Sequence, residues 1–290
     1  MTDETLPAGL YLVASPIGHL QDVTLRALEV LAHADLLACE DTRHSRRLLD
    51  RHGIKARAIP YHAHNEHRQL ARLLDELRAG RSVALLTDAG MPGISDPGLL
   101  LVRAARAEGI PVIPIPGPSA VITALAAAGL PTAPFTFLGF LPPRAGARRR
   151  ALSDAASLPH TLVIFEAPHR LGASLADMAE ILGSRAAVVC REMTKIHEEF
   201  RCGSLPELAA APPATRERGE ITVVIGPPTA RTEPAAVSIS LAEAWPRALS
   251  ACGGQRREAL RHLARQRGTS RNALYRDLLA AGLLADSRAP

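Results

Sequence analysis

Aromatic residues are scarce in this chain of 290 residues: they make up 3% of it, although 47% of the residues are hydrophobic. A core with so few aromatic rings has to be built from Ala, Leu, Val and Ile, which favours helices packed on strands. The length allows two packed α/β lobes, or one domain with an appendage. Cysteine is scarce too, and the absence of a CxxC pair argues against a disulfide framework or a zinc knuckle. The four cysteines are Cys39, Cys190, Cys202 and Cys252.

Long apolar runs are absent as well, and so is a recognisable targeting segment. The first residues, MTDETLPAGL, lack the basic region and the apolar stretch of a signal peptide. No apolar run approaches the length that a membrane span needs. We therefore expect a cytoplasmic protein that does not contact a membrane.

Lysine is almost missing: of 34 basic residues only Lys55 and Lys195 are lysines, so the arginine count partly reflects a compositional bias. The distribution of charge is more informative. Residues 231–290 contain ten arginines and five acidic residues, whereas the rest of the chain has 24 basic and 24 acidic residues. The net charge of +5 therefore comes from the last sixty residues, as expected if this segment contacts a polyanion.

Two nucleotide-binding signatures are also missing. No GxGxxG follows the first apolar run and no GxxxxGK(S/T) occurs, which weakens dinucleotide and P-loop interpretations. From residue 9 to about 129, short apolar runs instead alternate with helical patterns. This rhythm predicts an α/β fold, with a mostly parallel, doubly wound sheet in a first lobe over residues 9–130. Helices are expected near residues 42–52, 66–79, 99–108 and 119–128.

Prolines interrupt the pattern between residues 131 and 143, and a second alternation of strands and helices follows. It predicts a second α/β lobe over residues 133–228. Residues 227–240 are rich in Pro, Ala, Thr and Ser without periodicity, and are expected to form a linker.

A separate helical unit is expected over residues 241–285. Within it, RREALRHLARQRG ends at Gly268, and Thr269 or Ser270 can cap the next helix, which gives a helix-turn-helix shape. The pattern fits equally a helical hairpin that packs on the body or completes a dimer. The basic charge of the segment favours contact with RNA.

Two expected strands end in unusual loops. DAGMPGISDPG contains Gly90, Gly93 and Gly98 among prolines, so bare backbone can approach a ligand along a fixed course. Because its charges are Asp88 and Asp96, this loop suits a cationic group such as a sulfonium better than a phosphate. IPVIPIPGPSA places a serine at the start of a helix, where amides and a hydroxyl can bind a carboxylate or a ribose. Ligands of open α/β sheets bind at such strand ends, although a tight surface turn is the plainer alternative.

Polar residues that could carry chemistry gather after three further strands. Glu40, Asp41, Thr42, Arg43 and His44 form the first cluster; Glu166, His169 and Arg170 the second; Arg191, Glu192, Lys195, His197 and Glu198 the third. Arg191 and Lys195 are suited to stabilising an alkoxide or a phosphate, or equally to a salt bridge with Glu192. Helix capping is the alternative for His169 and for Glu40, and the better interpretation for Asp41.

Other basic residues have competing interpretations. His62, His64 and His67 have HxH and HxxH spacing, but only Glu66 is at hand to complete a zinc site, so no metal is expected. Arg148–Arg150 open an expected helix, where the helix dipole disfavours cations; phosphate contact or a solvated face would account for them.

Eight blocks occur in a fixed order: YLVASPIGHLQDVTLRALEVL, ACEDTRHSRRLL, LLTDAGMPGISDPG, IPIPGPSA, FLGFLP, FEAPHRL, CREMTKIHEE and GEITVVIG. Together they resemble the ribosomal small-subunit methyltransferase I family of the tetrapyrrole-methylase superfamily, over essentially residues 9–280. The sequence departs from the family pattern at Met91, where Thr is usual, at His19 (Asn), at Ala167 (Ser) and at Cys202 (Arg).

The resemblance implies two α/β lobes of the tetrapyrrole-methylase type with a C-terminal helical domain, S-adenosyl-L-methionine between the lobes, and a homodimer. It also implies methylation of the ribose 2'-oxygen of a cytidine in the decoding region of 16S rRNA, within the small ribosomal subunit. By position, the residues expected to line the cofactor site are Pro16, Gly90, Met91, Pro92, Ile94, Ser119, Ala120, Glu166, Ala167 and Thr222. The candidate catalytic residues are Glu166, His169, Arg191 and Lys195. The candidate RNA-binding residues are Arg43, Arg46, Arg148, Arg149, Arg256, Arg257 and Arg271.

Two other functions remain open. The same fold could methylate a porphyrin-like ring or another small acceptor, although a small molecule would need neither the basic C-terminal unit nor the cluster of arginines at residues 43–47. Alternatively, the α/β body could sense a ligand in a nucleic-acid-binding regulator, which would bind without turnover.

Overall fold

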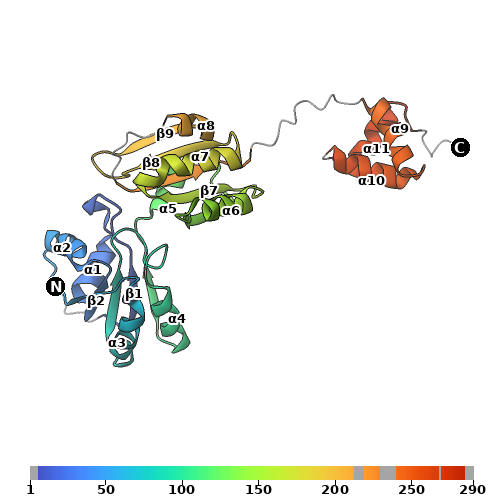
Figure 1. Cartoon of the computed structure of the whole chain (residues 1–290). Helices are drawn as coiled ribbons and strands as arrows, with labels where there is room; N and C mark the ends of the chain where they lie inside the picture. The colour runs from blue at the N-terminus through green and yellow to red at the C-terminus, as the bar shows by residue number, and fades with distance from the viewer. Residues whose placement is uncertain (1–5, 212–218, 229–239, 268, 285–290) are drawn as a thin grey trace. The chain divides into compact units, whose positions relative to one another are not determined.

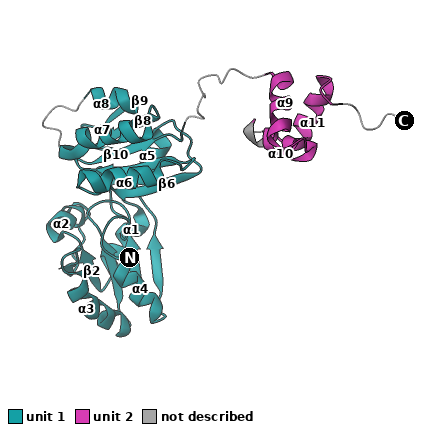
Figure 2. Ribbon diagram, turned by 45° about the vertical axis from the view of Figure 1, so that its right-hand side comes forward, with its two compact units in different colours: residues 1–229 teal, residues 230–290 magenta. Residues whose placement is uncertain are grey.

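The computed structural model describes residues 6–211, 219–228, 240–267 and 269–284. Its contacts divide the chain into two compact units, residues 1–229 and residues 230–290, coloured separately in Figure 2. The first unit contains two five-stranded sheets, and the described residues of the second unit form three helices and their connections (Figure 1). None of the described helices is long and apolar enough to cross a membrane.

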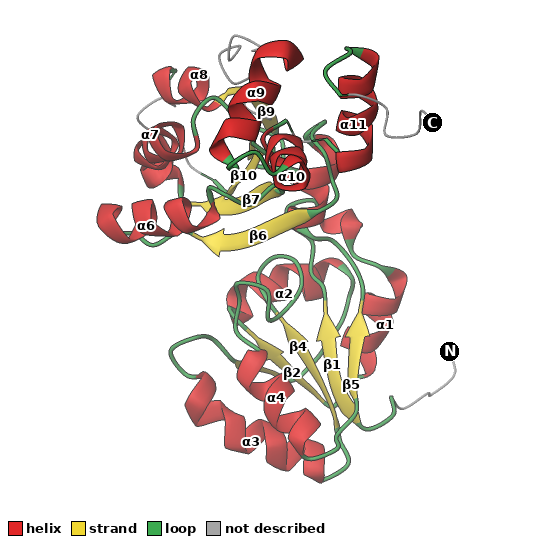
Figure 3. Ribbon diagram, turned by 90° about the vertical axis from the view of Figure 1, so that its right-hand side faces the viewer, coloured by secondary structure: helices red, strands yellow, loops and turns green. Residues whose placement is uncertain are grey.

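The first sheet is entirely parallel and has the order β3-β2-β4-β1-β5 (Figure 3). Its central strands are buried on both faces, as the apolar runs predicted. Helices α3 and α4 cover one face, while α1 and α2 cover the other. The strands are β1 (Gly9–Val13), β2 (Leu36–Cys39), β3 (Ala58–Pro60), β4 (Ser82–Leu86) and β5 (Val112–Ile115). The helices are α1 (Leu25–His33), α2 (Thr42–Arg51), α3 (Glu66–Arg78), α4 (Leu99–Ala107) and α5 (Ala120–Ala127).

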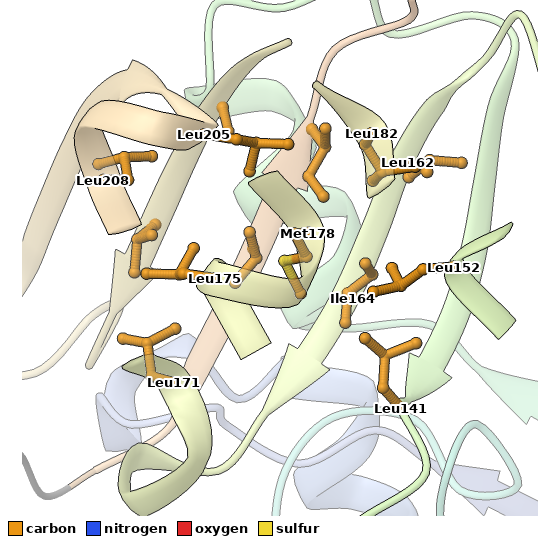
Figure 4. Close-up of a cluster of buried hydrophobic side chains, with 14 of the residues drawn as sticks. Leu141, Leu152, Leu162, Ile164, Leu171, Leu175, Met178, Leu182, Leu205 and Leu208 are labelled. Atoms are coloured by element: carbon orange, nitrogen blue, oxygen red, sulfur yellow. The ribbon is translucent and has the colours of Figure 1, made fainter. Parts of the chain in front are cut away.

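The second sheet is mixed and has the order β6-β7-β10-β8-β9. Only β6 and β7 pair in parallel; the other three pairs are antiparallel. Its strands are β6 (Phe135–Phe140), β7 (Thr161–Glu166), β8 (Ala186–Arg191), β9 (Glu199–Ser204) and β10 (Ile221–Ile225). Helices α6 (Ala145–Ala155), α7 (Leu171–Leu182) and α8 (Leu205–Ala210) contribute to the core on one face. In that core, Leu171, Leu175 and Met178 of α7 pack with Leu162 and Ile164 of β7 (Figure 4).

Helix α5 packs against the other face of the second sheet, although it follows the last strand of the first. Val121, Ala124 and Leu125 form one apolar cluster with Val163 of β7 and Val224 of β10. One face of α5 is buried in this cluster, while Ile122, Ala126 and Ala127 on another face are exposed. This packing brings the start of α5 and the loop after β4 towards the second sheet.

The C-terminal unit is made of α9 (Leu241–Ala251), α10 (Arg256–Gln266) and α11 (Arg271–Ala280). Trp245 and Leu274 belong to a core of its own. Of the two caps that the sequence allowed for the last helix, Ser270 is the one used, since its hydroxyl accepts a hydrogen bond from the amide of Ala273. The helices on either side of this cap have the predicted helix-turn-helix order.

Candidate functional site

The loops that leave β1 and β4 are joined by a short backbone bridge. The amide of Ser15 donates to the carbonyl of Gly90 at 2.9 Å, and the amide of Gly90 donates back at 3.1 Å. Gly90 and Gly93 have φ angles of 79° and 81°, a region that suits glycine. The expected glycine-rich bend is therefore fixed against the exit of the first strand, at the carboxyl ends of the parallel strands.

A cavity of about 350 Å³ opens between this loop and the second lobe; we call it the glycine-loop cavity. Its lining combines the loop after β4, the start of α5, the end of β7 and the start of β10. The lining residues are Ile17, Ala89–Met91, Ile94–Asp96, Ser119–Val121, Phe140, Phe165–Pro168 and Gly219–Thr222.

The structure brings most of the predicted cofactor residues together in this cavity. Gly90, Met91, Ile94, Ser119, Ala120, Ala167 and Thr222 all line it. Two members of the predicted set differ. Pro16 lines an adjoining pocket, which is described below. Pro92 is buried and does not line the glycine-loop cavity.

Sequence reasoning missed the aromatic wall of the glycine-loop cavity. The ring of Phe165 lies 5.5 Å from that of Phe140 and 4.9 Å from that of Phe137, measured between centroids. Phe140 and Phe165 belong to the quoted FLGFLP and FEAPHRL blocks, so their positions were visible. The contact between the two rings could not be predicted from the sequence, because it depends on the parallel pairing of β6 with β7.

Asp96 lines the glycine-loop cavity and lies near other acidic groups. Burial, together with the charges of Glu40 and Asp88, raises the pKa of Asp96 to about 7. Burial also raises the pKa of Glu40. Since carboxylates in such a setting are costly to ionise, a cationic ligand would be favoured here. This agrees with the charge that the loop sequence indicated.

Glu166, a candidate catalytic residue, lines the glycine-loop cavity, but neighbouring groups already bind its carboxylate. Its side chain is fully buried: one oxygen accepts from the amide of Ala167 at 2.8 Å, and the other accepts from the Ser174 hydroxyl. Arg170 also forms an ion pair with it, at 3.3 Å. Glu166 therefore holds the loop that carries Ala167. His169 is exposed in the adjoining 3-10 helix (Pro168–Arg170) and does not line the glycine-loop cavity.

Lys195 lies in a strained turn after β8. Glu192 and Thr194 both have positive φ angles, 48° and 65°. The Lys195 ammonium lies 2.8 Å from Glu192 and 3.2 Å from Glu220. Burial alone would lower the pKa of Lys195, but hydrogen bonds with these carboxylates outweigh it and raise the pKa. Lys195 is thus a fixed cation rather than a base, and the salt bridge expected with Glu192 is present.

The same turn touches the loop after β1. The amide of His19 donates to the Thr194 hydroxyl at 3.1 Å, and Gly18 leaves no room for a side chain beside Lys195. Arg191 lies at the end of β8 and contacts Glu199 at 3.4 Å. It does not line the glycine-loop cavity, whereas Lys195 lines the pocket beside it.

That second pocket, which we call the α2 pocket, has a volume of about 400 Å³. It shares Ile17, Ala89 and Glu220 with the glycine-loop cavity, so the two spaces adjoin. A wider groove of about 820 Å³, lined by Arg51, Lys195 and His197 among others, continues from it. The α2 pocket is lined by Ser15–Gly18, Leu20, His44, Ser45, Arg47, Leu48, Leu86–Ala89, Lys195 and Glu220.

The candidate RNA-binding arginines fall into two groups. Arg43, Arg46, Arg256, Arg257 and Arg271 are exposed, and Asp41 caps α2 as expected, through the amides of Arg43 and His44. Arg148 is different: it is 6% exposed and its guanidinium lies 2.6 Å from Asp177. Helix α6 begins at Ala145, so this arginine lies one turn further in than expected and faces α7. A buried, paired guanidinium cannot contact phosphate, so the prediction that Arg148 binds RNA is wrong.

Arg149 is partly exposed and pairs with Asp177 and Glu180, so α7 supplies an alternative reason for its position. The histidines of the YHAHNEH stretch show no metal arrangement: His62 and His64 approach edge to face, with ring centroids 6.0 Å apart. Among the described residues, no group of three or more His, Cys, Asp or Glu side chains is placed to hold a metal ion.

Residues 9–209 match the family model described as Tetrapyrrole (Corrin/Porphyrin) Methylases. The chain is 48% identical to the ribosomal RNA small subunit methyltransferase I of Mesorhizobium japonicum, over 94% of this chain and 92% of that protein. It is 43% identical to the protein of that name from Halalkalibacterium halodurans, over 92% of this chain and 93% of the relative. The chain belongs to the ribosomal RNA small subunit methyltransferase I family. The family resemblance of the eight blocks is thereby confirmed.

Solved structures confirm the fold class. A diphthine synthase structure matches with a TM-score of 0.60 and 16% identity, over 75% of this chain and 89% of that one. A cobalt precorrin-4 methyltransferase matches with a TM-score of 0.55 and 20% identity, over 75% of this chain and 94% of the other. At such low identity these likenesses concern the two-lobed architecture alone.

Proposed function

We propose that this protein transfers the methyl group of S-adenosyl-L-methionine to the ribose 2'-oxygen of a cytidine in the decoding region of 16S rRNA. The observation that carries the proposal is the family membership over more than nine tenths of the chain, together with a cavity that suits a sulfonium cofactor. The cytoplasm, where small ribosomal subunits are assembled, is the corresponding location.

The glycine-loop cavity fits the cofactor in size and chemistry. Its volume of about 350 Å³ falls in the range of small-molecule sites. The faces of Phe140 and Phe165 suit an adenine ring or a sulfonium. Ser119 caps α5, so the amides at the start of that helix are oriented for a carboxylate. When bound, the cofactor would supply an electrophilic methyl carbon.

The protein's own contribution to methyl transfer is mainly positioning. An in-line displacement is accelerated when the acceptor oxygen, the methyl carbon and the sulfur are held collinear in a closed site. The acceptor would enter from the α2 pocket, because this pocket adjoins the cavity at Ile17 and Ala89. Lys195 lies on the acceptor side as a fixed positive charge, suited to stabilise an oxygen that loses its proton.

The C-terminal unit is proposed to contact the RNA. Arg256, Arg257 and Arg271 are exposed on α10 and α11, in the segment that holds the whole net charge of the chain.

We propose also that the protein is a homodimer. Leu25, Leu99 and Ile122 are large apolar side chains that are more than half exposed and line none of the three pockets, as residues of a surface that a partner covers would be. Light scattering of the purified protein tests this: a mass of one chain would contradict it.

A tetrapyrrole or another small acceptor is the second candidate, since the same two-lobed fold occurs in enzymes named for such substrates. One assay separates the two. The protein is mixed with S-adenosyl-L-methionine carrying a labelled methyl group and with small ribosomal subunits that lack the modification. Label at one linkage of the 16S rRNA that resists alkali supports ribose methylation. Label only in an added tetrapyrrole, or no label at all, contradicts it.

A further inference from the structure

Two buried hydroxyl groups of the α2 pocket form no hydrogen bond of normal geometry with the described residues. Ser45 and Thr87 are each 2% exposed, and both line this pocket. Neither hydroxyl oxygen has a hydrogen-bond partner among the described residues. Ser45 does interact with the Cys39 thiol, and Thr87 with the Asp96 carboxyl, and each hydroxyl lowers the pKa of the group beside it.

An unpaired buried hydroxyl destabilises a fold, and native proteins seldom keep one without a reason. Two such groups on the wall of one pocket indicate that a ligand completes their hydrogen bonds. Neither is needed by helix or strand geometry: Ser45 lies inside α2, and Thr87 directly follows β4. An apolar side chain of similar size would fill either position.

The remaining chemistry of the pocket identifies the ligand. Asp88 lies beside Thr87, and one of its carboxylate oxygens accepts from the amide of Asp41 at 3.2 Å. The other oxygen can accept a further hydrogen bond, and a carboxylate only accepts, so it selects a donor such as an amino group. Arg47 and Lys195 line the same pocket and provide positive charge, as a nucleotide with its flanking phosphates requires.

Size limits the ligand to a single nucleoside. A pocket of about 400 Å³ cannot admit a paired or stacked strand, so a base that enters it has to leave its stack. The sugar of that nucleotide would then lie where the α2 pocket meets the glycine-loop cavity, beside Ile17 and Ala89. The arrangement places the sugar next to the proposed methyl donor and the base against Ser45, Thr87 and Asp88.

We propose that the α2 pocket takes up the unstacked base of the target nucleotide and that Asp88 recognises its exocyclic amino group, with Ser45 and Thr87 binding the rest of the base edge. This inference rests on the proposed function and names the residues that determine its base specificity. The carboxylate–amino pair is the contact by which proteins recognise cytosine.

The first test removes the hydroxyls and keeps the shape. Thr87→Val and Ser45→Ala should bind S-adenosylhomocysteine as the wild type does and should melt at the same or a higher temperature. We expect each to lower kcat/KM for small-subunit methylation about tenfold, mainly through KM for the subunit. Ser153→Ala, a serine change in helix α6 far from the pocket, is the matched control. Rates within twofold of the wild type in both variants would overturn the inference.

The second test exchanges specificity. Small subunits with cytidine or with uridine at the target position are compared as substrates for the wild type and for Asp88→Asn. The wild type should prefer cytidine by at least about tenfold. The Asn side chain can both donate and accept hydrogen bonds, so Asp88→Asn should reduce the preference for cytidine over uridine about tenfold or more. Asp50→Asn, on the exposed face of α2, is the control and should leave this preference unchanged.

An unchanged preference in Asp88→Asn, with an active wild type, would overturn the inference and leave the proposed function intact. No transfer by the wild type to either RNA would overturn the proposed function and the inference with it.

Discussion

Asp96 is held among other acidic groups at the point where the loop after β4 meets the second lobe. Burial and the charges of Glu40, Asp88 and Glu220 raise its pKa, whereas the Thr87 hydroxyl lowers it. With a pKa of about 7, the carboxyl changes its charge near neutral pH. A sulfonium in the glycine-loop cavity would favour the ionised form, because opposite charges attract more strongly in a partly buried site.

We therefore expect the dissociation constant of S-adenosyl-L-methionine to decrease as pH rises from 6 to 8, and Asp96→Asn to remove most of this dependence. Isothermal titration calorimetry of both proteins at several pH values measures the effect. S-adenosylhomocysteine is the control ligand: it carries the same amino acid and adenosine groups without the sulfonium charge, so its affinity should respond less. An equal pH dependence for both ligands would contradict the assignment.

The same shift in the pKa of Asp96 makes the stability of the ligand-free protein depend on pH. Asp96 has a folded pKa above its unfolded value, so its stabilising contribution is complete below about pH 4 and is lost as pH rises through about 7. Asp96→Asn should raise the melting temperature more at pH 8 than at pH 4. An equal effect at the two pH values, measured by calorimetry, would show that the carboxyl is not perturbed.

Gly90 forms the bend that lines one side of the candidate cofactor site and pairs with Ser15. Its φ of 79° strains any other residue, although a side chain would find space there. Gly90→Ala should cost about 1 kcal/mol of unfolding free energy, and should also weaken cofactor binding. Gly53→Ala is a matched control, since Gly53 has a φ of 66° in open space outside the cavity. Equal cofactor affinity in the two variants, measured beside denaturant unfolding, would contradict the role of the bend.

At the scale of elements, α6 and α7 are joined by a buried ion pair that the sequence did not reveal. Arg148 and Asp177 expose only 7% and 12% of their side chains, whereas the adjacent Arg149 is 41% exposed. Breaking a buried pair leaves an uncompensated charge, while a surface pair contributes little. We therefore expect Arg148 to contribute strongly to the stability of the protein and Arg149 to contribute little.

We expect Arg148→Met to lower the unfolding free energy by about 3 kcal/mol, and Arg149→Met to lower it by less than about 1 kcal/mol. Urea unfolding measures both. Comparable losses in the two variants would mean that the pair with Asp177 is not what fixes α6 on α7.

The first sheet could be predicted from the sequence, because strands buried on both faces give continuous apolar runs separated by amphipathic helices. The helix expected near residues 42–52 is observed at Thr42–Arg51. The second sheet was harder. Strand β9, EFRCGS, is half exposed at the edge of the sheet and lacks an apolar run, and the antiparallel pairing around β10 follows from chain reversals that local patterns do not specify.

The candidate site shows the same division between local and long-range information. Gly90 and Ser119 were found because turn chemistry and helix capping depend on neighbouring residues. The aromatic wall and the two unpaired hydroxyls were not found. They arise where segments about 25 residues apart or more meet, as Phe140 and Phe165 do, and no local pattern marks a hydroxyl that lacks a hydrogen bond.

At the scale of the whole molecule, the chain separates a neutral two-lobed unit from a basic helical one, each with its own core. This division predicts independent effects on cofactor and RNA. Changing Arg256, Arg257 and Arg271 together to Gln should leave cofactor affinity unchanged and weaken RNA binding. If all three contact phosphate, the plot of the logarithm of the RNA association constant against the logarithm of salt concentration should become less steep, with a slope smaller in magnitude by about 3.

The matched control removes the same charge from the first unit, by changing Arg72, Arg103 and Arg106 on α3 and α4 to Gln. These arginines are exposed and line neither the glycine-loop cavity nor the α2 pocket. RNA binding measured over a range of salt concentrations distinguishes the two triple variants. Equal losses in both would mean that net charge, and not the C-terminal unit, governs RNA affinity.

A crystal structure of the protein with S-adenosylhomocysteine tests the central claim most directly. We predict the nucleoside in the glycine-loop cavity between Phe165 and the bend at Gly90, with its sulfur directed towards Ile17 and Ala89, where the α2 pocket begins. Density for the ligand in the α2 pocket, or at any site outside the cleft between the two lobes, would contradict the account.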